Sequence, residues 1–405
     1  MAVGDAPLPA FFAIDGIRIG TANAGVKQTE RADVTVFEIA EGSTCAGVFT
    51  RNAFCAAPVH IAKANLAATA PRYWLVNTGN ANAGTGQAGF EAAQACIDAL
   101  AEKTGVAADT ILPFSTGVIG EPLPSAKIVA SLDDALKGLG ESRWADAGSA
   151  IMTTDTRPKG AIREISIAGK TVRICGLSKG AGMIKPNMAT MLSYVGTDAG
   201  VSSELLQSML NEANRLSFNR ITIDGDTSTN DSAVIVATGR SGVDVDALTA
   251  EEQLQFQTVL TDIYTELAQL IVRDAEGANK FVAVEVSGAA SESEAEMVAY
   301  TVAESPLVKT ALYASDPNWG RILAAVGRAG VESLAVENVS IRINGVLIAE
   351  QGGRAASYTE EAGVEALTPA DLLINIDLER GSDKATVWTS DLSHEYVTIN
   401  AEYRT

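Results

Sequence analysis

The stretch CGLSKGAGMIKPNMATMLSYVGTDAG, residues 175–200, is the part of the chain that says most about its fold. Glycines flank Lys179 in this stretch, and a second lysine stands before a proline at Lys185–Pro186. Ala189 and Thr190 come next, and an apolar run follows them. Proline prevents an ordinary helix here, and the apolar run has the length of a buried strand. The pattern therefore places Thr190 at the head of a core strand, directly after a constrained loop.

Two interpretations of Thr190 are open at this point. In the plain one, Thr190 simply begins a strand. In the other, its hydroxyl attacks the carbonyl of the preceding residue and cleaves the chain, so that Thr190 becomes a new N-terminus. The hydroxyl is then a nucleophile and the new α-amine, with a reference pKa of about 7.7 to 8, is its base.

Length, composition and charge exclude several classes of protein. The chain has 405 residues, is 47% hydrophobic, and carries 30 Lys and Arg against 50 Asp and Glu, for a net charge of −20. This favours two or three domains with ample cores and excludes a disordered chain. An acidic surface does not suit a nucleic acid or an anionic membrane. The N-terminal segment lacks a basic region and no apolar run approaches membrane-spanning length, so we expect a cytoplasmic protein.

Histidine and cysteine are scarce, which limits the catalytic chemistry. The four cysteines form no CxxC pair, and the two histidines, His60 and His394, lie far apart, so no metal site is expected. The plain interpretation of each histidine is a packed or surface side chain, with His60 at a strand edge. An enzyme with this composition needs another base, and the α-amine of a cleaved Thr190 would supply one.

Strands alternate with amphipathic helices along the chain, which predicts an α/β fold. The expected elements are strands over 34–40 and 74–78, a hairpin over 162–174, helices over 87–103, 125–139 and 203–218, and a long helix opened by a capping box at Thr249–Glu252. From about Phe281 the pattern becomes rich in strands and ends in YVTINAEY, residues 396–403. We therefore expect a main domain over 1–282 and a C-terminal domain over 283–405.

The segment KGAGMIKPNMATML, residues 179–192, resembles the self-cleavage motif of the ornithine acetyltransferase family, the glutamate N-acetyltransferases of arginine biosynthesis. Further segments are similar to family segments in the same order: AGVFTRNAFCAAPV (46–59), NTGNANAGTG (77–86), PFSTGVIGE (113–121), TTDTRPK (153–159), FNRITIDGDTSTND (218–231), DAEGANKF (274–281), SDPNWGRI (315–322) and NAEYRT (400–405). The resemblance thus covers essentially the whole chain. So many long motifs in one order are far more specific than any of them alone.

The resemblance implies a self-processing acetyltransferase. Cleavage between Ala189 and Thr190 would give an α chain, 1–189, and a β chain, 190–405. Thr190 would then take the acetyl group of N2-acetyl-L-ornithine as an ester and pass it to L-glutamate by a ping-pong route. Acetyl-CoA is a candidate second donor, although no motif identifies a CoA site, and no cofactor is expected.

The fold implied by the resemblance is a layered αββα-type sandwich in which the cleaved bond opens a central strand. A smaller C-terminal α/β domain would follow it. The two chains would stay associated, because the strand after Thr190 is apolar, and they would pair as an α2β2 heterotetramer.

The family's site positions map onto residues spread along the chain. The Thr116 hydroxyl and the Gly117 backbone N–H would form an oxyanion hole. The substrate-binding positions are Thr153, Lys179, Thr190, Glu276, Asn400 and Thr405. Lys179 suits an α-carboxylate, whereas Glu276 suits the ornithine amine or the Thr190 amine. Without the resemblance, Lys179 and Glu276 would be interpreted as solvated surface charges. Thr116 and Gly117 would be interpreted as part of an ordinary turn.

Two other functions fit parts of this pattern. A self-cleaving N-terminal-nucleophile amidase or aminopeptidase would share the fold and pass the acyl group to water instead of glutamate. An uncleaved homologue would instead serve as an amino-acid-binding protein, and an intact chain after purification would favour it.

Overall fold

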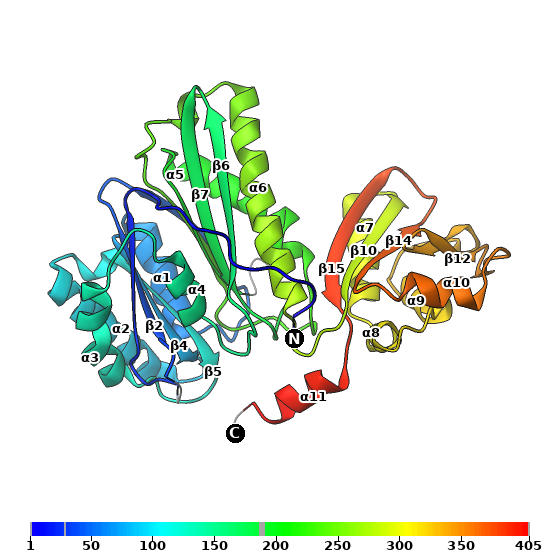
Figure 1. Ribbon diagram of the computed structural model, residues 1–405, viewed down its shortest axis with the longest axis horizontal. Coiled ribbons are helices and arrows are strands. Elements are labelled where there is room, and N and C mark those ends of the chain that lie inside the picture. The colour runs from blue at the N-terminus through cyan, green and yellow to red at the C-terminus, as the bar shows by residue number, and fades with distance from the viewer. Residues whose placement is uncertain (1, 28–29, 186–190, 404–405) are drawn as a thin grey trace.

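The computed structural model describes residues 2–27, 30–185 and 191–403. Its strands form three sheets, of which two pack face to face and the third lies to one side of them (Figure 1). The predicted cleavage pair, Ala189 and Thr190, and the predicted substrate residue Thr405 lie outside the described residues. No helix in the described ranges is long and apolar enough to cross a membrane.

The first sheet has four strands and is covered by helices on its outer face. Its strands, in spatial order, are β1 (Ile17–Ala22), β2 (Val34–Ile39), β4 (Tyr73–Asn80) and β5 (Ile111–Val118). Strands β4 and β5 are parallel, so the chain between them must cross over, and α2 (Gly86–Thr104) makes this crossing. Helix α2 and helix α3 (Ser125–Lys137) bury their apolar sides against this sheet, and α1 (Ala57–Ala68) packs beside β5.

The second sheet has five strands and contains the strand that follows Thr190. Its spatial order is β3 (Thr44–Phe49), β9 (Ser232–Ala237), β8 (Leu192–Thr197), β7 (Lys170–Lys179) and β6 (Lys159–Ile167). Strand β8 is central and buried along its whole length, as a core strand must be. Helices α5 (Ser203–Leu216) and α6 (Ala250–Arg273) cover the outer face.

The inner faces of these two sheets share one hydrophobic core, so the layers run helix, sheet, sheet, helix. Phe37 and Trp74 of the first sheet meet Tyr194 of the second, with ring centroids 5.2 and 5.8 Å from that of Tyr194. Trp144, from α4 (Trp144–Ala150), closes the same core. Aromatic pairs of this kind add about 0.5–1.5 kcal/mol each beyond their buried area. The predicted αββα-type α/β fold is confirmed.

The third sheet builds the C-terminal part of the molecule. Its spatial order is β13 (Gly353–Arg354), β12 (Val346–Glu350), β11 (Ser340–Ile343), β14 (Asp371–Asp377), β10 (Phe281–Ala289) and β15 (Asp383–Ser390). It shares a separate core with α7 (Glu292–Ala303), α8 (Pro306–Tyr313), α9 (Trp319–Gly327) and α10 (Glu360–Ala366). The boundary at 282/283 stays a prediction.

Local signals in the sequence agree with several elements. The turn between β6 and β7 holds Ala168 and Gly169 at φ of +48° and +74°, the left-handed pair that a two-residue hairpin turn needs. Both halves of the capping box at Thr249–Glu252 are present at the start of α6. The hairpin prediction and the capping prediction are therefore confirmed.

One predicted strand and one predicted strand-edge residue lie in helices instead. Most of YVTINAEY, up to Ala401, belongs to helix α11 (His394–Ala401), which begins where the Ser393 side chain accepts a hydrogen bond from the Tyr396 N–H. No residue of α11 is buried, so its β-branched side chains have no sheet face to pack on, and the N-cap decides the local structure. His60 lies in α1, because Pro58 in the first turn favours a helix start.

Candidate active site

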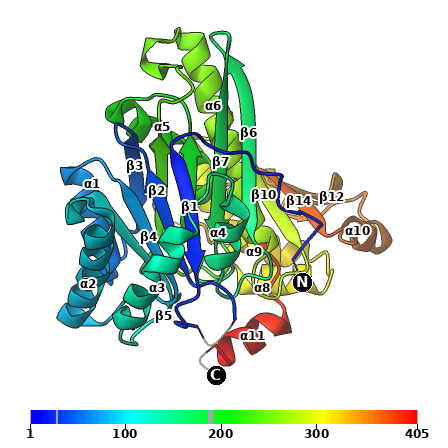
Figure 2. The same ribbon diagram turned by 60° about the vertical axis from the view of Figure 1, so that its left-hand side comes forward.

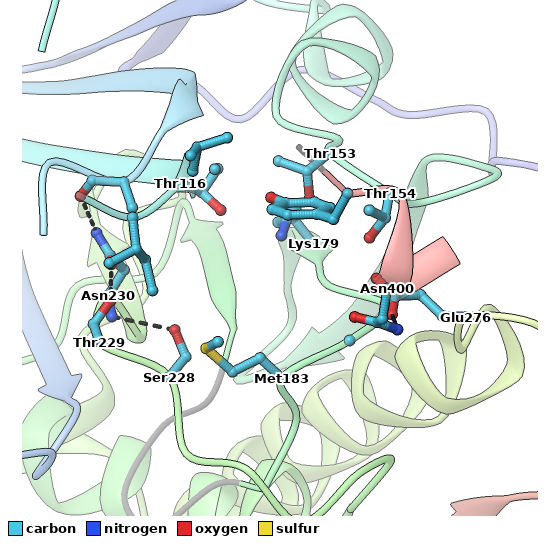
Figure 3. Close-up of a pocket in the computed structure, with 16 residues that line it drawn as sticks. Thr116, Thr153, Thr154, Lys179, Met183, Ser228, Thr229, Asn230, Glu276 and Asn400 are labelled. Carbon is cyan, nitrogen blue, oxygen red and sulfur yellow. Dashed lines mark hydrogen bonds between the residues drawn. The ribbon is translucent and has the colours of Figure 1, made fainter. Parts of the chain in front are cut away.

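A cavity of about 250 Å³ brings together residues from both sheets and from the C-terminal helix (Figure 3). Six residues predicted from the sequence line it: Thr116, Gly117, Thr153, Lys179, Glu276 and Asn400. These residues stand on β5, on β7, on the loops after α4 and α6, and on α11. Segments far apart in the sequence thus meet at one site.

Thr116 and Gly117 lie at the end of β5, beside the end of β4. Gly117 pairs with Gly79 across the parallel strands and has a φ of +137°, a left-handed conformation that glycine adopts freely. A Cβ atom at Gly117 would overlap the backbone of Gly79. Glycine is therefore required here by conformation and by space, and the close strand contact sets the direction of the loop that follows.

Lys179 ends β7 and reaches the same cavity. Burial lowers the pKa of its ammonium, while the carboxylates of Asp155, Glu276 and Asp231 act in the opposite direction. A desolvated lysine among carboxylates is a good receptor for a substrate carboxylate, because little water competes for its hydrogen bonds. Lys179 is among the residues that line the cavity (Figure 3).

Glu276 is buried and is held from two sides. Its backbone N–H donates to the Ala181 carbonyl at 2.9 Å, and its side chain accepts a hydrogen bond from Asn400 Nδ2 at 2.7 Å. A side chain at Gly182 would overlap the Glu276 carboxylate, so the glycine allows this close approach. Asn400 comes from α11, which returns beneath the two packed sheets (Figure 2). The end of the chain therefore contributes directly to the cavity.

Several lining residues were not singled out as site residues from the sequence. They are Ala81, Val118, Ile119, Thr154, Gly182, Met183, Ser228, Thr229, Asn230 and Tyr403. Asn230 Nδ2 donates to the Ala81 and Ser115 carbonyls at 2.6 and 3.0 Å, which fixes its loop against β5. Its motif, DGDTSTND, and the terminal NAEYRT were visible as family segments. Motif membership is the signal in the sequence for Asn230 and Tyr403, and for Asn230 the composition of its Gly-, Asp-, Thr- and Ser-rich loop agrees with it.

The residue after Thr190 is described and lies at the site. Met191 is buried, and its carbonyl accepts a hydrogen bond from the Ser232 N–H at 2.8 Å. With Thr116 and Lys179, Met191 lines a small cavity of about 30 Å³. The neighbour of Thr190 in the chain is therefore held beside Thr116, the predicted oxyanion-hole residue, and Lys179, the predicted carboxylate-binding residue. In the described part of the chain, no group of three or more His, Cys, Asp or Glu side chains is arranged to hold a metal ion.

Comparison with known proteins adds an independent line of evidence to this geometry. The family model described as "ArgJ family" matches residues 18–405. The chain belongs to the ArgJ family. The predicted resemblance to ornithine acetyltransferases is thereby confirmed.

Relatives in the ArgJ family are similar to this chain from end to end. The protein named "Arginine biosynthesis bifunctional protein ArgJ" from Pseudomonas syringae pv. tomato is 55% identical, with 100% of both chains covered. Its namesake from Methylococcus capsulatus is 53% identical over 97% of this chain and 96% of its own. A crystal structure of the Bacillus halodurans ArgJ protein is 41% identical with a TM-score of 0.50, and covers 52% of this chain and 99% of the solved chain.

Proposed function

We propose that this chain transfers the acetyl group of N2-acetyl-L-ornithine to L-glutamate, which yields L-ornithine and N-acetyl-L-glutamate. The observation that carries the proposal is one cavity that joins Thr116, Gly117, Lys179 and Glu276 beside Met191, the neighbour of Thr190. The full-length relatives named for arginine biosynthesis support the same reaction.

Self-cleavage is the first proposed step. The Thr190 hydroxyl attacks the Ala189 carbonyl, the amide bond becomes an ester, and water hydrolyses this ester. The products are an α chain, 1–189, with a new carboxylate and a β chain, 190–405, with a free α-amine. The Bacillus halodurans chain supports this step, since it is matched over 99% of its length while spanning 52% of this chain, as a separate second chain would.

Acetyl transfer then proceeds through an ester on Thr190. The Thr190 α-amine accepts the proton of the hydroxyl, whose oxygen attacks the acetyl carbonyl, and ornithine leaves as an amine that takes this proton. The glutamate amine attacks the resulting ester in the reverse sequence and regenerates Thr190. In both halves the Thr116 hydroxyl and the Gly117 N–H donate hydrogen bonds to the tetrahedral oxyanion.

The remaining lining residues are proposed to recognise the amino acid. Lys179 binds the α-carboxylate, and Glu276, held by Asn400, binds the ornithine side-chain ammonium. Thr153 lines the same wall, and Thr405 is proposed to complete it. The cavity of about 250 Å³ lies below the range of drug-sized pockets, so it suits one amino-acid-sized substrate at a time. A ping-pong route needs only that.

Several further properties belong to the same proposal. Acetyl-CoA is proposed as a second donor, in keeping with the word "bifunctional" in the relatives' names. The enzyme is proposed to act without a metal or cofactor, in the cytoplasm, as an α2β2 heterotetramer. Nucleic acids and membranes are not expected partners.

An assay with both donors tests the proposal. The purified protein is incubated with acetylornithine or acetyl-CoA, with and without glutamate, and N-acetylglutamate and free acetate are measured. Formation of N-acetylglutamate from acetylornithine is the expected result. Release of acetate at the same rate with and without glutamate would favour the amidase alternative. An uncut chain that binds amino acids without turnover would favour the amino-acid-binding protein.

Replacing Thr116 by valine is expected to lower kcat by about 10²- to 10³-fold, because one oxyanion donor is lost while the side-chain shape is kept. Steady-state kinetics with acetylornithine and glutamate measure this loss, and calorimetric binding of ornithine should change little.

Ser115→Ala is the matched control for Thr116→Val. Ser115 is the preceding residue on β5, faces the other side of the strand and donates to Asn77 Oδ1 at 2.5 Å. It should affect stability and leave kcat near the wild-type value. If Thr116→Val and wild type had the same kcat, the assignment of Thr116 to the oxyanion hole would be refuted.

A further inference from the structure

Three charged side chains form a buried ion triad directly behind the cavity: Asp155, Lys159 and Asp274. Lys159 Nζ lies 2.5 Å from Asp155 Oδ1 and 2.6 Å from Asp274 Oδ2, and none of the three side chains is exposed to solvent. None of them lines the cavity. The mechanism proposed above therefore leaves them without a role, although burying charges is costly.

The triad is tied to three segments that carry substrate-site residues. The Asp155 carboxylate accepts hydrogen bonds from the Thr153 N–H and from the Gly180 N–H, each at 2.8 Å. Gly180 directly follows Lys179. One carboxylate thus joins the loop that carries Thr153 to the end of the strand that carries Lys179.

The other half of the triad reaches the Glu276 segment. Asp274 accepts a hydrogen bond from the Thr156 N–H at 3.0 Å and another from the Thr156 hydroxyl. It stands two residues before Glu276, at the end of α6. Lys159, at the start of β6, links this turn to Asp155. The triad therefore connects the three segments that carry Thr153, Lys179 and Glu276.

The charges of the triad do not cancel. Two carboxylates face one ammonium, so one negative charge remains, and Asp155 interacts electrostatically with Lys179 as well as Lys159. Burial alone would raise the pKa of Asp155, but these two lysines and the Thr153 N–H hold it well below its usual range. Lys179 is thus one of the cations outside the triad that balance it, together with Lys27, which also acts on Asp155, and Arg157, which acts on Asp274.

We propose that the buried ion triad is the positioning device of the substrate cavity: it sets Thr153, Lys179 and Glu276 relative to one another and presents its excess negative charge to Lys179. This proposal rests on the proposed function, because it assumes that Lys179 receives a substrate carboxylate. Stability alone is a weak reason for such a group, since apolar replacements of buried ion triads are often equally stable. Positioning gives a reason for its presence behind this cavity.

The proposal predicts a change in pH dependence that a purely structural role would not cause. The charged groups that act on Lys179 are Asp155, Glu276 and Asp231, which favour its ammonium form, and Lys159 and Lys27, which oppose it. Removing the Asp155 charge lowers the pKa of Lys179 further. Lys179 then loses its proton at a lower pH, and binding of a substrate carboxylate weakens as the pH rises through that range.

The test compares Asp155→Asn with wild type. We expect kcat/KM for acetylornithine to fall by about 10²-fold, because a displacement of catalytic or binding groups by about 1 Å lowers the rate by a factor of that size. We also expect calorimetric binding of ornithine and glutamate to be lost at lower pH than in wild type. An Asp155→Asn protein with wild-type kcat/KM and a wild-type pH profile would overturn the proposal.

Two further variants guard against a folding defect. The neutral triad Asp155→Asn, Lys159→Met and Asp274→Asn keeps the side-chain sizes and removes all three charges together, so none of the triad's own charges is left unpaired. It should fold, which circular dichroism and Tm measure. Its pH profile should shift in the same direction as that of Asp155→Asn but by less, because Asp155 acts on Lys179 more strongly than Lys159 does. A folded neutral triad with the wild-type profile would contradict the proposal.

Glu294→Gln is the matched control, since Glu294 pairs with Arg380 at 2.9 Å in the C-terminal part. It should change Tm without moving the pH profile. If wild type forms no N-acetylglutamate, the proposed function fails, and the binding profiles still decide the role of the triad.

Discussion

Replacing Thr190 by alanine is expected to leave one uncut chain of 405 residues that transfers no acetyl group. The substitution removes the hydroxyl that cleaves the chain, and without cleavage the α-amine that serves as base never forms. Loss of a catalytic nucleophile lowers kcat by about 10⁶-fold in well-studied hydrolases, so activity should fall below detection. Intact mass spectrometry and the two-donor assay measure both effects on the same sample.

Thr190→Ser is the control for this experiment, because serine keeps the hydroxyl and the ability to release an α-amine. It should still be processed into chains 1–189 and 190–405 and retain part of the activity. An unprocessed Thr190→Ala protein with full activity would overturn the mechanism. Processing that continues in Thr190→Ala would place the cleavage elsewhere.

Removal of residues 402–405 is expected to abolish acetyl transfer. Tyr403 lines the cavity, and the removed segment follows Asn400, whose side chain donates to Glu276 at 2.7 Å. Truncation opens the cavity to water and removes the proposed contact of Thr405. We expect kcat/KM to fall by more than about 10²-fold, measured with acetylornithine and glutamate. Processing at Ala189–Thr190 should continue.

A control variant in α11 distinguishes the effect of losing residues 402–405 from the effect of disturbing the helix. His394 stands at the start of α11 and packs edge to face on Tyr313, with ring centroids 5.6 Å apart, and does not line the cavity. His394→Ala should therefore keep most of the activity. Full activity of the protein without residues 402–405 would refute the assignment of Thr405.

Much of the secondary structure could be predicted from the sequence, because a strand, a turn or a helix cap depends mainly on residues that are neighbours in the chain. Pro186, which disfavours a helix, and the apolar run after Thr190 predicted a core strand, and β8 is the central, buried strand of its sheet. The turn at Ala168–Gly169 and the capping box at Thr249 likewise depend only on neighbouring residues. The strand prediction over 396–403 was wrong because β-branched residues favour a strand only where a sheet face can pack them, and α11 has no such face.

The candidate site divides in the same way. Ordered motifs indicated Thr116, Lys179 and Glu276, but Lys179 stands 63 positions after Thr116 and 97 before Glu276, and nothing in this spacing predicts that the three side chains meet. Tyr403 and the loop at 228–230 became site residues only when α11 and the second sheet were placed beside β5.

The sequence by itself determined the family and the α/β class, because both follow from ordered motifs and local patterns. The nucleophile role of Thr190 is implied by the family resemblance, agrees with the scarcity of histidine, and stays a prediction. Only the tertiary structure decided what surrounds Lys179. Lys159 is an ordinary basic residue in the sequence, and it becomes the centre of a buried triad because β6 pairs with β7 and α6 ends beside them. Asp155 and Lys159 are only four residues apart in the chain, but Asp274 lies 115 positions after Lys159, and the packing of α6 against β6 and β7 brings it to them and buries all three side chains.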